Sequence, residues 1–194
     1  MKDEMSSMRC NDVWDHVELP NDAKVIGCKW VFKTKKDSLG NTERYKAKLV
    51  AKGFTQKKGI DYTETFSPVS KKDSLHIILT LVAYFDLELQ QMDVKTAFLN
   101  EELEEEVYMK QPEGFPSSDG EKLVCKLKKS IYGLKQASRQ WYLKFHNIIY
   151  SFGFVENVMD QYIYLKVNRS KVYFLVLYVD DILLATNDND LLHG

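Results

Sequence analysis

The strand and helix patterns of this sequence are compatible with an α+β fold. Residues 29–35 and 42–50 alternate between apolar and polar side chains around a turn-rich segment, which predicts a β-hairpin. Residues 137–152 carry apolar side chains at helical spacing and predict a long helix. Residues 172–179 and 182–185 are apolar runs rich in Val, Ile, Leu and Tyr, which predict two strands joined by a two-residue turn.

The size of the chain favours one folded unit. Its 194 residues, 44% hydrophobic and 28% charged, suffice for one good core and are few for two, so we expect one globular unit, with or without a lobe. Residues 1–23 predict an N-terminal arm, formed as a helix or as an extended arm, with Trp14 as an anchor and a turn at residues 19–22. Residues 24–194 are then the main domain.

The second strand of the predicted hairpin carries a row of cations. Period-2 spacing places Arg44, Lys46 and Lys48 on one face and apolar neighbours on the other. Three cations in a row repel one another unless an anion lies across them. A polyphosphate or a nucleic-acid backbone would serve.

The middle of the chain predicts a helix followed by a strand. Residues 75–85 are apolar and helical in pattern, with Asp73 and Ser74 as the candidate N-cap. The strand predicted over residues 87–94 places Asp93 near its end. Catalytic groups are commonly displayed at such ends, which makes Asp93 a candidate site residue.

The net charge of −1 hides strong segregation along the chain. Residues 24–72 hold 13 Lys and Arg against 4 Asp and Glu, residues 73–121 hold 2 against 12, and residues 122–146 hold 7 against none. Such blocks indicate either one surface that faces phosphates or solvated faces that happen to be sorted. The acidic stretch at 101–106 lacks an apolar wall and favours solvated surface, and residues 123–127 predict a short strand.

Several classes of protein are disfavoured. The longest apolar run is far shorter than a membrane span, and the first residues lack the apolar region of a signal peptide. Cys10, Cys28 and Cys125 are odd in number and widely spaced, which indicates reduced thiols rather than disulfides or a zinc site. No GxxxxGK, HExxH or GxSxG motif is present.

Asp180 and Asp181 lie inside an apolar stretch, where an unpaired buried carboxylate costs several kcal/mol. One explanation is a hairpin turn, which aspartate tolerates well. The other is a metal. Nucleotidyl transfer uses two divalent cations bridged by carboxylates, and Asp93, Asp180 and Asp181 could supply those carboxylates. Such a small ligand set suits Mg²⁺ better than Ca²⁺ or Zn²⁺.

Four segments in order resemble the reverse transcriptases of copia-type LTR retrotransposons, and the chain as a whole resembles the elements of plants. They are residues 44–54 (RYKAKLVAKGF), 91–100 (QMDVKTAFLN), 130–141 (SIYGLKQASRQW) and 178–181 (YVDD). Residues 61–68 (DYTETFSP) extend the likeness over nearly the whole chain. One YxDD tetrapeptide is weakly specific, whereas all four segments together are strongly specific.

The resemblance implies a fold and a reaction. The fold is the fingers and palm of a reverse transcriptase, an antiparallel palm sheet packed on helices, with the thumb missing because the chain stops soon after the YVDD hairpin. The reaction is RNA-directed DNA synthesis by two-metal nucleotidyl transfer from a dNTP to the primer 3′-hydroxyl. Asp93 matches the first metal aspartate, and Asp180 and Asp181 match the pair in the hairpin. The cofactor is then two Mg²⁺ ions, with Mn²⁺ as a substitute.

The resemblance also implies a nucleotide-binding set. It comprises Arg44, Lys46, Lys48, Phe98, Gly133, Gln136, Tyr178 and Val179. The three cations would hold the triphosphate, and Phe98 would exclude a ribose 2′-hydroxyl, although a buried core role is equally open to a Phe. Tyr178 and Val179 would lie near the primer terminus or the incoming sugar. Gly133 and Gln136 belong to a loop that packs beneath the template base and nucleotide, or else to a turn that starts a helix.

Three positions depart from the family pattern. Lys48 and His76 stand where the family commonly has Arg, and Glu101 stands where it commonly has Gly. Lysine binds phosphate as a point charge and lacks the planar fork of arginine, so triphosphate affinity is affected first. Glutamate fits poorly in a turn that needs positive φ.

Two other functions compete with an active polymerase. One is a truncated, catalytically inactive retroelement remnant that at most binds nucleic acid, and the other is a metal-independent nucleic-acid-binding module. The partners implied by the family are an RNA or DNA primer–template, dNTPs and the rest of a Pol polyprotein (thumb, RNase H and integrase), with no membrane. The implied location is a cytoplasmic virus-like particle, with a possible nuclear phase.

Overall fold

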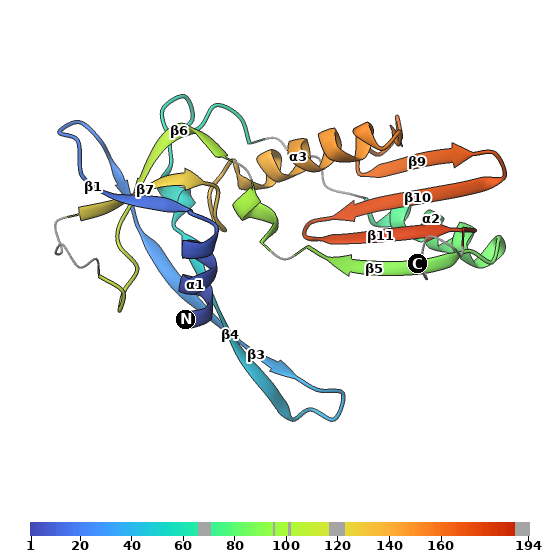
Figure 1. Cartoon of the computed structure of the whole chain (residues 1–194), viewed down its shortest axis with the longest axis horizontal. Coiled ribbons are helices and arrows are strands. Elements are labelled where there is room, and N and C mark those ends of the chain that lie inside the picture. The colour runs from blue at the N-terminus through green and yellow to red at the C-terminus, as the bar shows by residue number, and fades with distance from the viewer. Residues whose placement is uncertain (66–70, 95, 101, 117–122, 189–194) are drawn as a thin grey trace. The chain divides into compact units, whose positions relative to one another are not determined.

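The computed structural model describes residues 1–65, 71–94, 96–100, 102–116 and 123–188 (Figure 1). The chain forms two compact units, each assembled from two separate segments. Unit 1 comprises Met1–Phe66 and Phe98–Trp141, and unit 2 comprises Ser67–Ala97 and Tyr142–Gly194. The class is mixed α and β, as the sequence predicts. Within the described residues, no helix is long and apolar enough to cross a membrane.

Unit 1 contains a four-stranded sheet and a separate hairpin. The sheet has the order β1-β7-β6-β2, and β3 pairs with β4 alone. The elements are α1 (Lys2–Cys10), β1 (Trp14–Glu18), β2 (Val25–Ile26), β3 (Cys28–Lys36), β4 (Thr42–Ala51), η1 (Gly53–Thr55), β6 (Glu102–Met109) and β7 (Leu123–Lys129). The 3₁₀ turn η2 (Ala97–Asn100) starts at the unit boundary. The predicted hairpin and the strand predicted at 123–127 are therefore present.

The N-terminal residues pack into unit 1. Strand β1 runs antiparallel to β7, with Trp14 opposite Leu127. Met5 and Met8 of α1 are buried. A carboxylate oxygen of Glu4 accepts a hydrogen bond from the Leu49 backbone N–H at 3.2 Å. The segment predicted as a helix or arm thus contributes both a helix and an edge strand to this unit.

The acidic stretch at 102–106 belongs to a strand that the sequence pattern did not predict. Strand β6 pairs with β7, with an irregularity in the register between Glu102 and Val107. An ion pair joins Glu106 to Lys126 on the neighbouring strand. Exposed and half-buried residues alternate from Glu102 to Glu106, as in a strand with one solvated face. The run of like charges hid that alternation, because glutamates occupy both faces.

Unit 2 is a five-stranded antiparallel sheet with the order β5-β11-β10-β9-β8. Its elements are α2 (Lys72–Tyr84), β5 (Glu88–Asp93), α3 (Ala137–Ser151, from Tyr142 on), β8 (Val155–Glu156), β9 (Ile163–Asn168), β10 (Lys171–Tyr178) and β11 (Asp181–Thr186). The helix predicted at 137–152 and the strand predicted at 87–94 are present.

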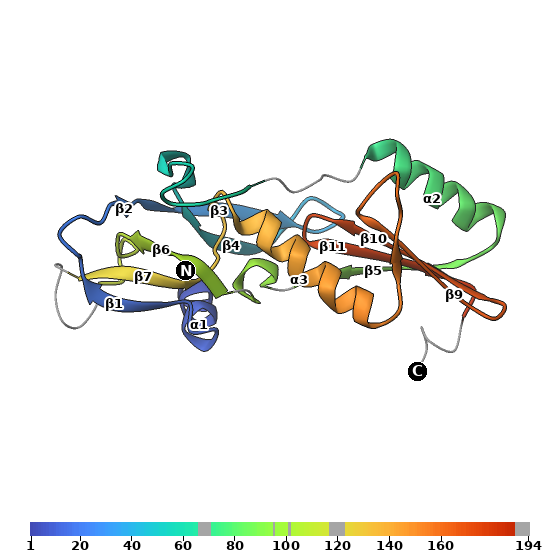
Figure 2. The same ribbon diagram turned by 90° about the horizontal axis from the view of Figure 1, so that it is seen from above.

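The two helices cover opposite faces of this sheet (Figure 2). Ile78 of α2 packs with Ile163 and Val176 in a buried cluster. The ring of Phe145 in α3 lies 5.7 Å from that of Tyr164. Successive strand residues point to opposite faces, so Ile163 and Tyr164 mark the two sides. The sheet is thereby held as the middle layer of unit 2.

Helix α2 begins earlier than the sequence indicated. Lys71, not Asp73 or Ser74, occupies the N-cap, and Asp73 lies in the first turn. The extended Lys71 directs its N–H to a carboxylate oxygen of Asp160 at 3.1 Å. A carboxylate that is distant in sequence therefore accepts from the N–H of the N-cap residue itself, while Asp73 complements the positive end of the helix dipole.

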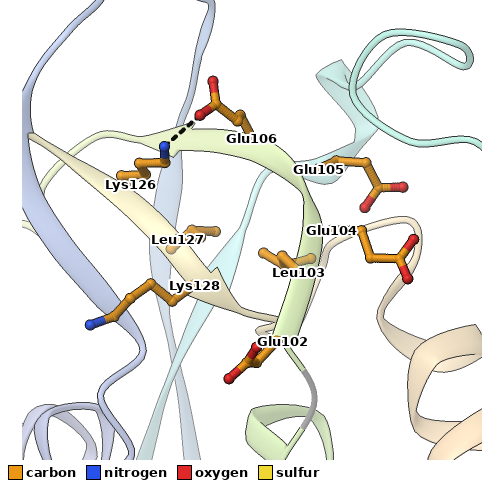
Figure 3. Close-up of a pocket in the computed structure, with 8 residues that line it drawn as sticks. All are labelled: Glu102, Leu103, Glu104, Glu105, Glu106, Lys126, Leu127 and Lys128. Atoms are coloured by element: carbon orange, nitrogen blue, oxygen red, sulfur yellow. Dashed lines mark hydrogen bonds and ion pairs between the residues drawn. The ribbon is translucent and has the colours of Figure 1, made fainter.

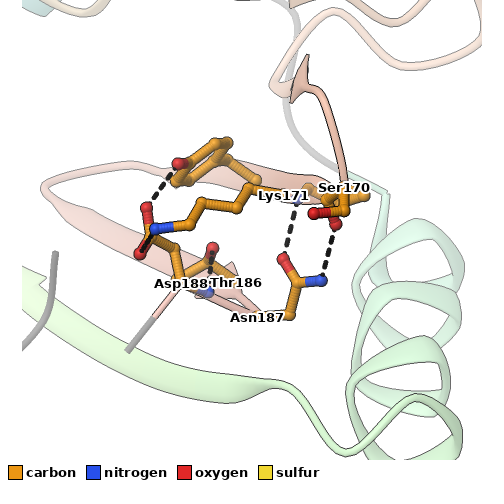
Figure 4. A network of polar contacts seen from close by, with 7 residues as sticks. Ser170, Lys171, Thr186, Asn187 and Asp188 are labelled. Carbon is orange, nitrogen blue, oxygen red and sulfur yellow. Dashed lines mark hydrogen bonds and ion pairs between the residues drawn. The ribbon is translucent and has the colours of Figure 1, made fainter. Parts of the chain in front are cut away.

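A polar network fastens the open end of the β10–β11 pair (Figure 4). Asn187 accepts a hydrogen bond from the Val172 N–H at 2.8 Å and donates one to the Ser170 carbonyl at 2.9 Å. Asp188 accepts a 2.6 Å hydrogen bond from the Tyr173 hydroxyl and forms an ion pair with Lys171. That hydrogen bond raises the pKa of Tyr173. These contacts fix the register from the end opposite the hairpin tip.

Candidate active site

The acidic pair lies at the tip of the β10–β11 hairpin. Tyr178 is paired with Asp181, so the two-residue turn is Val179-Asp180, and Asp181 is the first residue of β11. The sequence-based placement of both aspartates in the turn was one residue off, because apolar runs do not mark the residue at which pairing stops. Val179 has φ 57°, which is unusual for a β-branched residue.

The third aspartate lies directly across the sheet from this pair. Strand β5 runs beside β11, and Asp93 is the register partner of Asp181. The Val94 N–H donates a 3.0 Å hydrogen bond to the Asp180 carbonyl, which ties the end of β5 to the hairpin tip. Two carboxylates directly opposite on neighbouring strands repel each other. A cation between them would remove that repulsion.

The side chains at the tip differ in their access to solvent. Asp93 is exposed, Asp180 and Asp181 are half-buried, and Oδ1 of Asp180 is shielded from solvent. Tyr178 is 38% exposed and Val179 is 56% exposed. The three aspartates predicted to bind metal therefore lie in unit 2, together with Tyr178 and Val179.

The donors at the tip suit a hard cation, although they do not enclose one. Within the described part of the chain, no group of three His, Cys, Asp or Glu side chains is close enough to hold a metal ion. Mg²⁺ is commonly held by one or two carboxylates together with substrate phosphates and water. The facing carboxylates of Asp93 and Asp181 fit that requirement, with Asp180 next in the chain.

Asp181 also has a neutral partner on β5. The side-chain amide of Gln91 donates from Nε2 to Oδ1 of Asp181 over 3.3 Å. The sequence expectations did not include Gln91. Its spacing of two residues from Asp93 could have found it, since residues two apart on a strand share a face.

The cations predicted on one strand are joined by others from its partner. Lys46 lies directly opposite Lys33, and Arg44 lies opposite Lys35, in the β3–β4 hairpin of unit 1. Lys48 lies opposite Val31 on the same face. Like charges directly opposite destabilise a hairpin, so this cationic face favours an anion. The register of the hairpin, which a bulge shifts at Lys35/Lys36, was needed to see the pairing.

In unit 1, Lys48 lies over one aromatic ring, which packs in turn against a second. Its Nζ lies 3.7 Å from the centroid of the Tyr132 ring, within cation–π range. The ring of Phe98 meets Tyr132 edge to face at a centroid distance of 4.7 Å. Phe98 is 6% exposed, so in this structure it has the buried environment of a core residue. Tyr132, which begins the loop that contains Gly133 and Gln136, connects the two predicted nucleotide-binding residues Lys48 and Phe98.

Gly133 and Gln136 hold the backbone of unit 1 together. Gly133 has φ 93°, and a Cβ there would lie 2.2 Å from the Ala51 carbonyl oxygen. Gln136 is 1% exposed. Its amide accepts a 3.2 Å hydrogen bond from Gln56 and donates a 3.3 Å bond to the Asp61 carbonyl. Both residues have packing roles here, as the alternative of a turn that starts a helix predicts.

The remaining acidic cluster is separate from these aspartates. A pocket of about 370 Å³ is lined by β6 and β7 (Figure 3), and its residues are Glu102, Leu103, Glu104, Glu105, Glu106, Lys126, Leu127 and Lys128. Neighbouring lysines balance part of its charge, since Glu106 pairs with Lys126. This agrees with a solvated acidic surface.

Of the positions that depart from the family pattern, His76 is exposed on α2. Lys48 makes the cation–π contact with Tyr132 described above. Glu101 lies outside the described residues.

Comparison with known proteins gives a consistent family. Residues 11–194 match the family model described as reverse transcriptase (RNA-dependent DNA polymerase). The chain is 50% identical over 193 residues to the retrovirus-related Pol polyprotein from transposon TNT 1-94 of Nicotiana tabacum, and 43% identical over 195 residues to that from transposon RE1 of Arabidopsis thaliana. It is 28% identical over 170 residues to the transposon Ty1-H Gag-Pol polyprotein of Saccharomyces cerevisiae.

These relatives are much longer than the chain. The alignments cover 99%, 100% and 85% of the chain but 14%, 13% and 9% of the three polyproteins. No solved structure matches the chain.

Proposed function

The chain belongs to the reverse transcriptase family of copia-type transposon Pol polyproteins, and we propose that it forms the fingers and palm of an RNA-directed DNA polymerase. In this proposal unit 2 is the palm and carries the reaction centre. The β3–β4 hairpin of unit 1 is the fingers element that meets the incoming nucleotide. The observation that carries the proposal is the placement of Asp93 opposite Asp181 at the hairpin tip.

The proposed reaction joins a dNTP to the primer 3′-hydroxyl. The 3′-oxygen forms a bond to the α-phosphorus, the bond to the bridging oxygen breaks, pyrophosphate leaves and the hydroxyl proton is released. Two Mg²⁺ ions, or Mn²⁺ in their place, would activate the hydroxyl and neutralise the leaving group when bound. Asp93, Asp180 and Asp181 would hold them, and the rigid β5–β11 pairing would keep their carboxylates in register.

The residues of the β3–β4 hairpin are proposed to bind the triphosphate. Arg44, Lys46 and Lys48 present positive charge on one face, where a polyphosphate would relieve their mutual repulsion. Tyr132 seats the Lys48 ammonium on its ring. A lysine held this way keeps its charge while its flexible stem is restrained.

Five other residues would shape the sugar and template contacts. Tyr178 and Val179, exposed at the hairpin tip, are proposed to lie near the primer terminus or the incoming sugar. Phe98 would exclude a ribose 2′-hydroxyl, and Gly133 and Gln136 would hold the loop beneath the nucleotide. The contact of Phe98 with Tyr132 and the buried amide of Gln136 support indirect roles through packing.

Primer–template, dNTPs and the other parts of a Pol polyprotein, namely thumb, RNase H and integrase, are the proposed partners. A cytoplasmic particle is the proposed location. The resemblance to copia-type reverse transcriptases implies these partners and this location, and the relatives are named as Pol polyproteins of transposons.

A second candidate function is nucleic-acid binding without catalysis. It is favoured by the absence, among the described residues, of a group of three side chains that could hold a metal ion. The cationic hairpin would then bind phosphates while the aspartates remain inert.

Primer extension on an RNA template with Mg²⁺ tests the first function against the second. We expect Asp180→Asn to reduce synthesis by at least about a hundredfold, since one carboxylate at the transferring phosphate is worth several kcal/mol. Asp86→Asn is the matched control, because Asp86 is an exposed carboxylate of the same unit outside the site. Salt-sensitive nucleic-acid binding without any Mg²⁺-dependent synthesis would support the second function instead.

A further inference from the structure

Gln91 stands in a fixed relation to the paired aspartates. It lies two residues before Asp93 on β5, so both side chains project from the same face of the sheet. Asp181, directly opposite Asp93, is the diagonal neighbour of Gln91 across the strand pair. Long side chains reach such a diagonal neighbour, and Gln91 does so with a 3.3 Å hydrogen bond to Oδ1 of Asp181.

We infer that Gln91 is a positioning residue that orients the Asp181 carboxylate for a divalent cation. The inference rests on the proposed function, because it takes Asp181 as a ligand. The amide donates to one carboxylate oxygen and restricts rotation of the group, so the second oxygen keeps a defined direction. Hydrogen bonds of this kind to ligating carboxylates commonly tune metal affinity.

A neutral donor suits this place better than a cation or a hydroxyl. A lysine or arginine would compete with the metal for the charge of Asp181, whereas an amide hydrogen bond leaves that charge in place. A serine or threonine two residues from Asp93 is too short to reach the diagonal position. Glutamine combines the required reach with a neutral donor.

The neighbouring residue supplies a matched control. Gln90 is the register partner of Leu184, and its side chain projects from the opposite face of β5. Gln90 and Gln91 are both exposed. Replacing either glutamine by methionine removes an exposed amide of β5 and keeps a similar length, but only Gln91→Met removes the contact with Asp181.

The first measurement is the binding of Mn²⁺ to the chain, followed by the electron paramagnetic resonance signal of free Mn²⁺. We expect Gln91→Met to weaken binding about tenfold, at the lower end of the effect of outer-sphere partners, because the bond is exposed to solvent. Gln90→Met should bind as the unchanged chain does, and Asp181→Asn should lose more affinity than Gln91→Met. Equal binding by the two methionine variants would overturn the inference.

The second measurement uses the full Pol polyprotein in primer extension. Gln91→Met should raise the Mg²⁺ concentration needed for half-maximal synthesis about tenfold, while kcat at saturating Mg²⁺ stays within about twofold. A fall in kcat that Mg²⁺ does not restore would contradict a positioning role. If Gln91→Met fails to fold, Gln91→Thr replaces it, since threonine favours strands and cannot reach Asp181.

The outcomes separate the inference from the function on which it rests. If the unchanged chain binds Mn²⁺ and the polyprotein makes DNA, but Gln91→Met resembles Gln90→Met, only the positioning role fails. If the unchanged chain binds no Mn²⁺ and the polyprotein makes no DNA, the proposed function fails and the inference fails with it.

Discussion

Val179 combines a strained backbone with an exposed side chain at the hairpin tip. Its φ of 57° lies in the left-handed region, where a β-branched side chain clashes with its own backbone. Such strain commonly persists at functional sites, because the surrounding structure imposes it. The paired strands on both sides, joined at Tyr178 and Asp181, impose it here.

Relief of this strain should stabilise the protein. We expect Val179→Asn to raise the free energy of unfolding by about 1 kcal/mol, because asparagine adopts positive φ at lower cost. Urea denaturation measures the change. Val167→Asn is the control, since Val167 is similarly exposed (60% against 56%) but lies within strand β9. It should lose stability through its poorer strand propensity, and a gain at Val167 would remove the argument from φ.

The three cysteines should differ in reactivity. Burial raises the pKa of Cys125 to about 12, whereas Cys10 is exposed. Only the thiolate reacts, and with such a pKa about one Cys125 in a thousand is ionised at pH 9. Iodoacetamide labelling followed by mass spectrometry should therefore show rapid modification of Cys10 in the folded chain. Cys125 should be modified rapidly only after unfolding, and its slow labelling in the folded chain should become faster as the pH rises. Rapid labelling of Cys125 at pH 8 in the folded chain would contradict this.

At the scale of elements, the β3–β4 hairpin is destabilised by the like charges that it places opposite one another. Its cross-strand pairs Lys33–Lys46 and Lys35–Arg44 place cation against cation. Each such pair costs some stability, which an anion would restore. The hairpin of unit 2 has the opposite charge at its tip, where Asp181 faces Asp93. Each element thus concentrates charge of one sign, and the proposed function supplies each with a ligand of the opposite sign.

Reversal of one charge in the cationic hairpin should separate stability from binding. Lys46→Glu places an anion opposite Lys33, and we expect a gain of about 0.5 kcal/mol in the free energy of unfolding together with weaker binding of tripolyphosphate. Thermal unfolding and calorimetric titration measure the two effects. Lys36→Glu is the control, since its partner Thr42 is neutral. If Lys46→Glu destabilised the protein while Lys36→Glu did not, repulsion between Lys33 and Lys46 would be excluded.

At the scale of the whole molecule, each unit depends on contacts between chain segments that are distant in sequence. In unit 1 the loop at Gly133 passes against the end of β4, where the Ala51 N–H donates a 2.8 Å hydrogen bond to the Tyr132 carbonyl. Gly53 makes an equally close approach to the Gly133 carbonyl, since a Cβ at Gly53 would lie 2.0 Å from that oxygen. The loop that carries Tyr132 is thereby fixed beneath Lys48.

A methyl group at this crossing should disrupt unit 1. We expect Gly133→Ala to lower the free energy of unfolding by about 3 kcal/mol, through the strain of positive φ together with a clash against the Ala51 carbonyl. Chemical denaturation measures the loss. Gly114→Ala is the control, because Gly114 has φ 80° but nothing lies within 4 Å of its added Cβ. It should cost about 1 kcal/mol, and equal losses would exclude the clash.

Much of this protein was open to prediction from sequence because the patterns are local. Alternation and helical spacing indicated the hairpin at 29–50, the helix at 137–152 and the strands around the acidic pair. The motifs indicated the family and the three aspartates. Strand β6 was missed because charge masked its alternation, and the start of α2 was misplaced because its capping partner, Asp160, is 89 residues away in sequence.

The sequence alone determined most of the elements and the positions of the charged residues, since both follow from neighbouring residues. Only the tertiary structure decided the pairing of Asp93 with Asp181, the reach of Gln91, the seat of Lys48 on Tyr132 and the burial of Gln136. Periodicity assigns a side chain to a face of its strand but not to a partner on another strand. That partner is selected by register and close packing across the whole fold.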